Sequence, residues 1–208
     1  MLVSNCYDAG GIMRLLDIGG SYKKLAKIKK GVFLDFTKDS KSCLNPFGTI
    51  NEIDEDLSSI CAIILQMIYS KSDNPPVEIA ETVTTLIKDA VLWSYSNRGR
   101  EAGIDEVHAF LNEYPAHSAE MRDRRGSGAE KITETAHFLA FNLREFTSKG
   151  RFGRWFNGKS TLDISRDEFV VLELENLKPI PELFKVVVLQ IINEIVNDAY
   201  LSDRMQER

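Results

Sequence analysis

The alternation of apolar and polar residues predicts two short strands near the start of the chain. Residues 12–18 form an apolar run that ends at a pair of glycines, and residues 32–36 form a second run. The segment 22–30 between them places two apolar residues on one helical face and five lysines elsewhere, and Ser21 stands in front of it as a helix cap. We therefore expect a strand, a short helix and a second strand, with the two strands parallel.

From about residue 51 the apolar period changes from two to about 3.6 and keeps that value for roughly a hundred residues. This change predicts an all-helical middle section made of amphipathic helices. The apolar stripes that mark them lie at 57–68, 83–91, 104–113 and 132–146.

The end of the chain returns to a strand pattern and then to a helix. Residues 169–174 read as an apolar strand, and two prolines then open a long helix from about Glu182 to Asp203. The apolar arc of this last helix is broad, which predicts burial on two sides.

These elements predict an α/β fold that is predominantly helical, with about three strands of a parallel sheet interrupted by an all-helical insertion. The expected domains are a partial core of strand, helix and strand at 1–50, the helical insertion at 51–150, and a return to the core at 151–208. Parallel sheets are covered on both faces and contain about five or six strands, so the chain looks like part of a larger domain.

Composition narrows the class of protein. The 208 residues are 43% hydrophobic and 27% charged, which is typical of a globular chain, and the net charge of −5 supplies no global field for nucleic acid. No apolar run approaches the roughly 18 residues that a membrane span needs, so we expect a cytoplasmic protein without membrane insertion. Cys6, Cys43 and Cys61 are widely spaced and have no histidine at ligand spacing, which indicates reduced thiols and no metal site.

One segment matches the phosphate-loop pattern G-x-x-x-x-G-K-[ST]. A phosphate loop needs a buried strand before it and a helix after it, whereas here a helical stretch precedes the motif and a strand-like stretch follows it. Trp155 and Phe156 would also crowd the backbone that wraps phosphate. We interpret the match as a coincidence and expect no cofactor there; the residues that carry it are Gly153, Gly158, Lys159 and Ser160.

The strand at 169–173 imitates the strand whose final acid holds magnesium in nucleotide hydrolases, with Glu173 in place of the aspartate. It follows the phosphate-loop match too closely for a helix and a crossover to fit between them. We therefore expect Glu173 to be a surface carboxylate at a strand end. No serine or cysteine lies in a nucleophile elbow, and the three histidines are scattered.

A basic cluster interleaved with aromatic residues follows the last helix of the insertion. We expect it to be a solvated helix end with an aromatic lid, and contact with phosphate or with a neighbouring subunit is the alternative. The cluster consists of Arg144, Lys149, Arg151, Arg154 and Lys159, with Phe152, Trp155 and Phe156 between them.

Five segments, taken in chain order, resemble TraC-type conjugative-transfer ATPases, the large cytoplasmic motor ATPases of type IV secretion. They are Leu15-Leu16-Asp17-Ile18-Gly19-Gly20-Ser21-Tyr22-Lys23-Lys24-Leu25, Cys43-Leu44-Asn45-Pro46-Phe47, residues 150–158 (G-R-F-G-R-W-F-N-G), residues 169–175 (F-V-V-L-E-L-E) and residues 200–204 (Y-L-S-D-R).

In that family the phosphate loop lies upstream of the first segment, and the magnesium-binding acidic strand lies just after the last one. The resemblance thus implies an internal piece of a RecA-like P-loop ATPase core with a helical insertion. It also implies that residues 153–160 match the turn after the insertion and not the nucleotide site. For the complete family it implies ATP and magnesium as cofactors, an oligomer and other secretion subunits as partners, and a place beside the inner membrane.

Few catalytic roles carry over to this chain. Asp17, at the end of a core strand, is a candidate for facing the nucleotide site of a complete protein. Arg151 or Arg154 is a candidate for reaching the phosphates of a neighbouring subunit, because such arginines are often supplied in trans.

We expect the chain by itself to be structural, to lack ATPase activity and not to bind nucleic acid directly. In a complete protein it would serve ATP hydrolysis that drives DNA or protein transfer or pilus assembly. One alternative is a self-standing helical interaction module of a secretion or DNA-transfer complex. Another is a small nucleoside triphosphatase that uses Gly158, Lys159 and Ser160.

Overall fold

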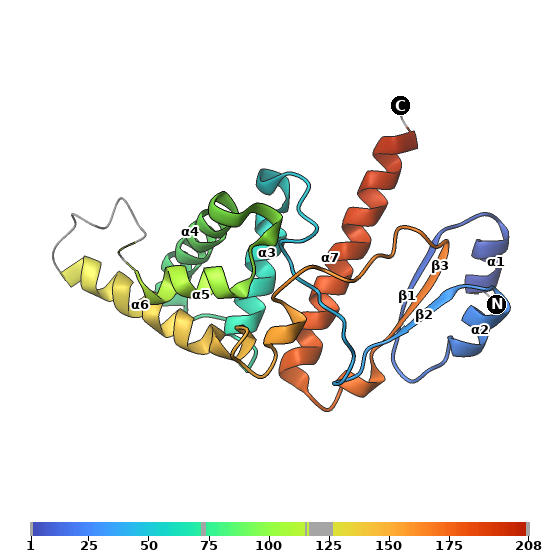
Figure 1. The fold of residues 1–208 in the computed structure, drawn as a ribbon, viewed down its shortest axis with the longest axis horizontal. Helices are drawn as coiled ribbons and strands as arrows, with labels where there is room; N and C mark the ends of the chain where they lie inside the picture. The colour runs from blue at the N-terminus through green and yellow to red at the C-terminus, as the bar shows by residue number, and fades with distance from the viewer. Residues whose placement is uncertain (1, 72–73, 115, 117–126, 207–208) are drawn as a thin grey trace. The chain divides into compact units, whose positions relative to one another are not determined.

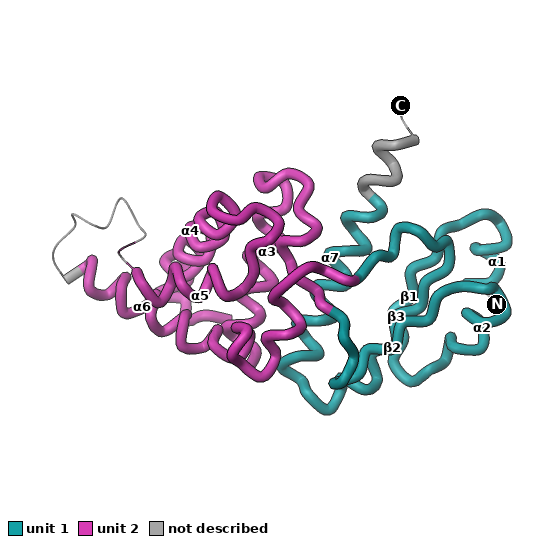
Figure 2. Tube along the Cα trace, in the orientation of Figure 1, with its two compact units in different colours: residues 1–42, 162–208 teal, residues 43–161 magenta. Residues whose placement is uncertain are grey.

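The chain folds into two compact units. The computed structural model describes residues 2–71, 74–114, 116 and 127–206 (Figure 1). Unit 1 contains residues 1–42 and 162–208, and unit 2 contains residues 43–161 (Figure 2). The elements confirm an α/β fold that is predominantly helical.

Unit 1 is built on a three-stranded parallel sheet, as predicted. Its strands are β1 (Met13–Asp17), β2 (Val32–Asp35) and β3 (Phe169–Glu173). The order is β1-β3-β2, so β1 and β2 are parallel to each other but do not pair. The strand that comes last in the sequence therefore lies in the middle of the sheet, and all five of its residues are buried.

The register brings the carboxyl ends of the three strands to one edge. Asp17 and Asp35 both lie opposite Glu173. Two further backbone hydrogen bonds extend the pairing beyond the strands, from the Phe36 amide to the Glu173 carbonyl at 2.9 Å and from the Leu174 amide to the Asp17 carbonyl at 3.0 Å.

One face of the sheet is covered by two short helices, α1 (Leu2–Asp8) and α2 (Lys23–Ile28). The sequence pattern did not predict α1, and α2 is shorter than expected. Their side chains pack on a core of Ala26, Phe169 and Val171. Tyr7, for example, meets the ring of Phe169 edge to face, with the ring centroids 5.1 Å apart.

The long helix α7 (Pro181–Gln206) belongs to the same unit. Arg14 of β1 reaches it through an ion pair with Asp198 at 3.0 Å, in which both side chains are mostly buried. Leu183, Val186, Val187 and Ile191 of α7 are buried. Ile192 and Val196, however, are 45% and 57% exposed, so the prediction that the whole apolar arc is buried was wrong for this part of the helix.

Unit 2 is all-helical, as the 3.6-residue period predicts. Its helices pack around one apolar core, to which α3 contributes Ile60, Ile63 and Ile64 and α5 contributes Phe110 and Leu111. The α-helices are α3 (Ile53–Ile68), α4 (Ala80–Arg98), α5 (Ile104–Asn112) and α6 (Ser127–Leu143). The single-turn 3₁₀ helices are η1 (Val77–Ile79), η2 (Gly99–Glu101), η3 (Arg144–Phe146) and η4 (Gly153–Trp155), with η5 (Glu175–Leu177) in unit 1.

The two ends of unit 2 are bonded to each other. The Thr161 amide donates to the Cys43 carbonyl at 2.9 Å, and the Cys43 amide donates to the Thr161 hydroxyl, also at 2.9 Å. The Leu44 amide adds a bond to the Trp155 carbonyl at 2.6 Å. These contacts make a closed base from which the helical unit extends.

Asn45 ties together three segments of unit 2 just inside this base. Its side chain is fully buried. The carboxamide nitrogen donates to the carbonyls of Ala102 at 2.7 Å and Gly158 at 2.9 Å, and the oxygen accepts from the Phe47 amide at 3.1 Å. One buried side chain thus bonds three backbone groups that lie far apart in the sequence.

The described helices differ from membrane-spanning helices in length and composition. Within the residues that the structure describes, no helix combines the length and the apolar character that crossing a bilayer requires.

Replacing Asn45 by Ala should lower the free energy of unfolding by about 3 kcal/mol, because two carbonyls and one amide lose their partner in a buried site. Asn45→Asp should be at least as harmful, because a carboxylate turns an acceptor toward the two carbonyls. Urea unfolding followed by helical circular dichroism measures both. The exposed residue Asn51 supplies the control, since Asn51→Ala should change stability by less than about 0.5 kcal/mol. Equal stability of the Asn45 and Asn51 variants would contradict the role given to the carboxamide.

Candidate functional site

The carboxyl edge of the sheet is the place where a parallel α/β protein usually holds its ligand. All three strands end there in an acid: Asp17, Asp35 and Glu173. Asp17 and Glu173 are each only 4% exposed, whereas Asp35 is exposed and accepts a hydrogen bond from the Asn176 amide group at 3.1 Å.

Asp17, the candidate for facing a nucleotide, is bonded to its own loop. Its carboxylate Oδ2 accepts from the backbone amide of Tyr22 at 2.8 Å. Tyr22, and not Ser21, is the N-cap position of α2, and this helix has no side-chain cap bond. Asp17 instead bonds the amide of the residue that precedes the helix. The prediction of a Ser21 cap was therefore wrong.

Glu173 holds the turn between β1 and α2 from the neighbouring strand. Its Oε1 accepts from the amides of Gly19 at 3.1 Å and Glu175 at 2.9 Å, and its Oε2 accepts from the amide of Gly20 at 2.6 Å. Gly19 and Gly20 have φ angles of 115° and 70°, a backbone that glycine adopts readily and that turns successive amides toward the carboxylate. The expectation of a surface carboxylate was wrong, because Glu173 is buried and fully bonded.

The ionisation of Glu173 follows from these contacts. Burial raises the pKa of its carboxyl group, but hydrogen bonds from the backbone amides of Glu175, Gly19 and Gly20, together with Asp17, lower it, and the net pKa lies below the ordinary value. The folded protein therefore holds Glu173 as a carboxylate at neutral pH.

The described residues at this edge of the sheet do not form a metal site. Among the described residues, no group of three or more histidine, cysteine, aspartate or glutamate side chains is placed so that it could hold a metal ion. The oxygens of Glu173 face backbone amides, which compete with a cation for the same lone pairs.

The phosphate-loop match lies in unit 2 and has a different shape from a phosphate loop. Gly153 begins η4 and packs so closely that an added Cβ would clash with the Thr147 carbonyl. Trp155 and Phe156 are 1% and 0% exposed and belong to the core. Residues 161–168 contain no helix, and strand β3 follows them directly. The match therefore has no helix N-terminus behind it that would face a phosphate.

Asn157, within the same segment, is bonded in the manner of Asn45. Its Oδ1 accepts from the Asp105 amide at 3.0 Å, in the first turn of α5, and its Nδ2 donates to the carbonyls of Phe146 at 2.9 Å and Gly153 at 2.8 Å. The segment is therefore a structural joint between the start of α5 and the turn after α6.

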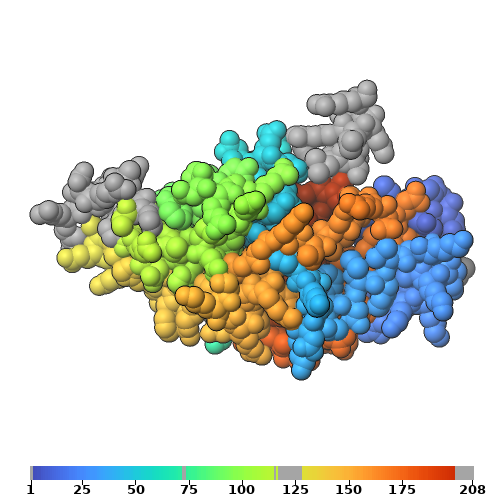
Figure 3. All heavy atoms as spheres, in the orientation of Figure 1, coloured from blue at the N-terminus to red at the C-terminus, as the bar shows by residue number. Residues whose placement is uncertain are grey.

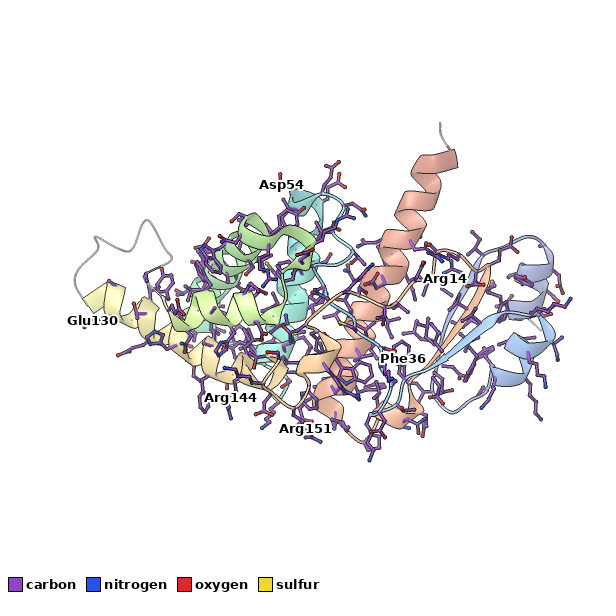
Figure 4. The ribbon with its side chains drawn as sticks, in the orientation of Figure 1. Arg14, Phe36, Asp54, Glu130, Arg144 and Arg151 are labelled. Carbon is purple, nitrogen blue, oxygen red and sulfur yellow. The ribbon has the colours of Figure 1, made fainter. Side chains whose placement is uncertain are left out.

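The basic cluster is exposed and its aromatic residues are buried. The guanidinium of Arg151 lies 5.0 Å from the ring centroid of Phe152, and that of Arg154 lies 5.6 Å from that of Trp155. Both arginines are exposed and lie on unit 2, where Figure 4 labels Arg151 and Arg144. The aromatic residues form part of the core, so the expectation of an aromatic lid was wrong, while Arg151 and Arg154 are exposed to solvent.

Lys159 and Ser160 line a pocket that sequence reasoning did not find. It has a volume of about 600 Å³, and we call it the basic pocket. Arg98 and Arg100, which lie some sixty residues earlier, supply its other cations, and only the folded chain brings them to the same place. The full lining is Gly48, Arg98, Arg100, Glu101, Gly158, Lys159 and Ser160.

The three thiols differ in their environment. Cys6 is exposed. Burial raises the pKa of Cys43, whose sulfur also lies 3.6 Å from the Asn157 carbonyl oxygen. Burial raises the pKa of Cys61 to about 11, although the charge of Lys88 acts in the opposite direction. Neither of the latter two has the lowered pKa that a reactive cysteine needs.

The segments quoted for the family resemblance come together in pairs. The first and the fourth meet where Glu173 binds Gly19 and Gly20. The second and the third meet where Leu44 pairs with Trp155 and Asn45 binds Gly158. The fifth, residues 200–204, lies in the last part of α7, whose side chains fall outside the described residues.

Comparison with known proteins gives a consistent result. A family model described as the TraG P-loop domain matches residues 1–204. Protein TraC from Escherichia coli (strain K12) is 27% identical over 203 residues, which are 98% of this chain and 22% of TraC. The structure of VirB4 from Thermoanaerobacter pseudethanolicus has a TM-score of 0.68 and 14% identity, and the match covers 95% of this chain and 51% of that one. The chain thus spans about a fifth of TraC and about half of the VirB4 structure.

Glu173→Gln should lower the free energy of unfolding at pH 7 by about 2 kcal/mol, because one carboxylate oxygen that accepts from an amide becomes an NH₂ donor. A depressed folded pKa gives stability that is complete above the ordinary glutamate pKa and is lost as the pH falls through the folded value. The difference between the wild type and E173Q should therefore shrink on acidification. Urea unfolding from pH 7 to pH 3 measures it, with the exposed Glu175→Gln as the matched control. A pH-independent difference would refute the assignment.

Proposed function

Because the chain belongs to the TraG P-loop domain family, we propose that it serves as a structural segment of a type IV secretion motor ATPase. The segment contains a slice of the RecA-like core and the helical insertion that interrupts it. By itself it neither binds ATP tightly nor hydrolyses it. Its role is to form part of the core of a complete protein. Other parts of that protein contribute the nucleotide site.

The observation that carries this proposal is the pairwise assembly of the resemblance segments. At these meeting points side chains satisfy backbone amides or carbonyls: the buried Glu173 in unit 1, and the buried Asn45 and half-buried Asn157 in unit 2. Such contacts use most of the hydrogen-bonding capacity of these groups. Residues that look like a catalytic signature in the sequence therefore act as joints.

A hydrolytic site for ATP and magnesium fits neither the residues at the carboxyl edge of the sheet nor those of the phosphate-loop match. The phosphate-loop match lacks the helix that would face the phosphates, and the acid at the end of β3 is occupied by three backbone amides. We therefore place both cofactors outside the described residues, in the complete ATPase. There, ATP hydrolysis would drive DNA or protein transfer or pilus assembly by a cytoplasmic oligomer docked on other secretion subunits at the inner membrane.

A direct contribution to catalysis by this chain would come from its exposed arginines. Arg151 and Arg154 are held over aromatic rings with their guanidinium groups open to solvent. An arginine supplied by a neighbouring subunit stabilises the charge that builds up during phosphoryl transfer. Asp17 is a weaker candidate, because its carboxylate already accepts a hydrogen bond from the Tyr22 amide.

A second candidate function is protein interaction by unit 2. It is favoured by the bonded base at Cys43 and Thr161, which lets the helical unit close on itself. A docking module needs such a base because its binding face must keep its shape independently of the sheet.

The purified chain should release no phosphate from ATP above the buffer blank in a malachite-green assay with magnesium, and Lys159→Ala should leave this result unchanged. Arg166→Ala, a change at an exposed residue of unit 1, serves as the control. Turnover that Lys159→Ala abolishes and Arg166→Ala preserves would replace the structural proposal with that of a small nucleoside triphosphatase.

In a complete homologue, changing the residue equivalent to Arg154 to alanine should reduce kcat for ATP by at least about tenfold if the arginine acts in trans. Mixing this variant with a phosphate-loop variant of the same protein should restore part of the activity, because each subunit then supplies what the other lacks. Unchanged turnover in the alanine variant would remove the arginine from the mechanism and leave the structural role standing.

A further inference from the structure

We propose that the basic pocket of unit 2 binds a ligand through linked phosphate groups. The proposal goes beyond the structural role above, because it gives this chain a ligand of its own. It takes Lys159 and Ser160, which cannot work as a phosphate loop, and places them in a different kind of anion site.

The charges of the basic pocket favour an anion. Arg98, Arg100 and Lys159 bring three positive charges against the single carboxylate of Glu101. Arg98 also pairs with Glu106 at 2.8 Å. Within the described part of the chain, Arg100 and Lys159 have neither an ion pair nor a hydrogen bond from their side chains. In a chain with a net charge of −5, two unpaired cations beside one pocket form a local positive site.

The two walls of the basic pocket are held in place by one buried side chain. Asn45 donates to the carbonyl of Ala102, just after η2, and to the carbonyl of Gly158, just before Lys159. The wall that carries Arg98 and Arg100 and the wall that carries Lys159 are therefore tied to the same carboxamide. A ligand does not have to assemble these backbones on binding, which lowers the entropic cost of association.

Further contacts fix the mouth of the pocket. Glu106 accepts from Arg98 with one oxygen and from the Gly103 amide with the other at 2.7 Å, so the guanidinium of Arg98 is anchored at the end of α4. At Gly48 an added Cβ would come within 2.9 Å of the Ser160 Cβ. Glycine at this position keeps the space beside Ser160 open.

The lining indicates phosphate and not an apolar ligand. It contains no aromatic or aliphatic side chain on which a base or a hydrocarbon could stack. Guanidinium groups bind phosphate in a bidentate manner, and an ammonium adds a point charge. The Ser160 hydroxyl donates to the Cys43 carbonyl at 3.3 Å, so the donors for a phosphate are the cationic side chains and not this hydroxyl. A volume of about 600 Å³ exceeds what a single small anion fills, so linked phosphates suit it better than one phosphate.

Titration of the full chain with inorganic pyrophosphate, followed by isothermal calorimetry at low salt, tests the proposal. Arg100→Ala combined with Lys159→Ala should weaken binding by at least about tenfold, because two charge-assisted contacts are lost. Lys71→Ala combined with Lys131→Ala removes the same charge from two other exposed positions of unit 2 and should bind as the wild type does. Thermal unfolding checks that all three proteins are folded.

The proposal is overturned if the wild type does not bind pyrophosphate, if the Arg100/Lys159 variant binds equally well, or if the Lys71/Lys131 variant loses as much affinity. Phosphate can come from a free nucleotide or from a nucleic-acid backbone, and two further titrations separate these sources. Stronger binding of an oligothymidylate than of pyrophosphate, with a steep salt dependence, indicates a backbone. Equal binding of pyrophosphate and magnesium-free ATP indicates free phosphates.

Binding that requires magnesium and adenine would contradict the basic pocket, since its lining has no carboxylate pair for a cation and no surface for a base. These outcomes do not depend on ATP hydrolysis. The structural role of the chain can therefore stand whether the pocket binds phosphate or not.

Discussion

The sheet can exist only if residues 43–161 return to the point at which they leave it. Strand β3 lies between β1 and β2 and runs parallel to both, and parallel neighbours cannot be joined by a tight hairpin. The loop entropy of so long an excursion opposes this pairing. The paired hydrogen bonds between Cys43 and Thr161 offset part of that cost by holding the two ends of unit 2 together. Packing of the helices in unit 2 and pairing of the strands in unit 1 are thus coupled through one short joint.

The polar side chains inside the protein are likewise held by hydrogen bonds to the backbone. The buried Glu173 and Asn45 and the half-buried Asn157 each bond three backbone groups, some of them far away in the sequence. Burying a polar group costs little when it is bonded in this way. An acid at the end of a strand and an asparagine in a turn are also what a nucleotide site uses. Only the position of their partners separates the two roles, and here the partners are amides and carbonyls of the protein itself.

Local periodicity was enough to predict the strands, the four helices of unit 2 and the fold class, because each depends on residues close together in the sequence. Local periodicity could not predict the strand order, because the pairing of Asp17 with Glu173 joins residues more than 150 positions apart. The helix α1 was missed because seven residues carry too little pattern. The N-cap position of α2 is Tyr22 and not Ser21, and no local signal in the sequence predicts that Arg100 and Lys159 line the same pocket.

The graded burial of the three thiols makes the chain a convenient object for spectroscopy. Cys61, with a pKa of about 11, and the buried Cys43 form almost no thiolate at neutral pH, whereas Cys6 lies exposed on α1. A maleimide dye therefore attaches selectively beside the three-stranded sheet without any cysteine having to be removed. The natural sequence thus provides a single-site fluorescent reporter on unit 1, ready to follow its behaviour inside a larger assembly.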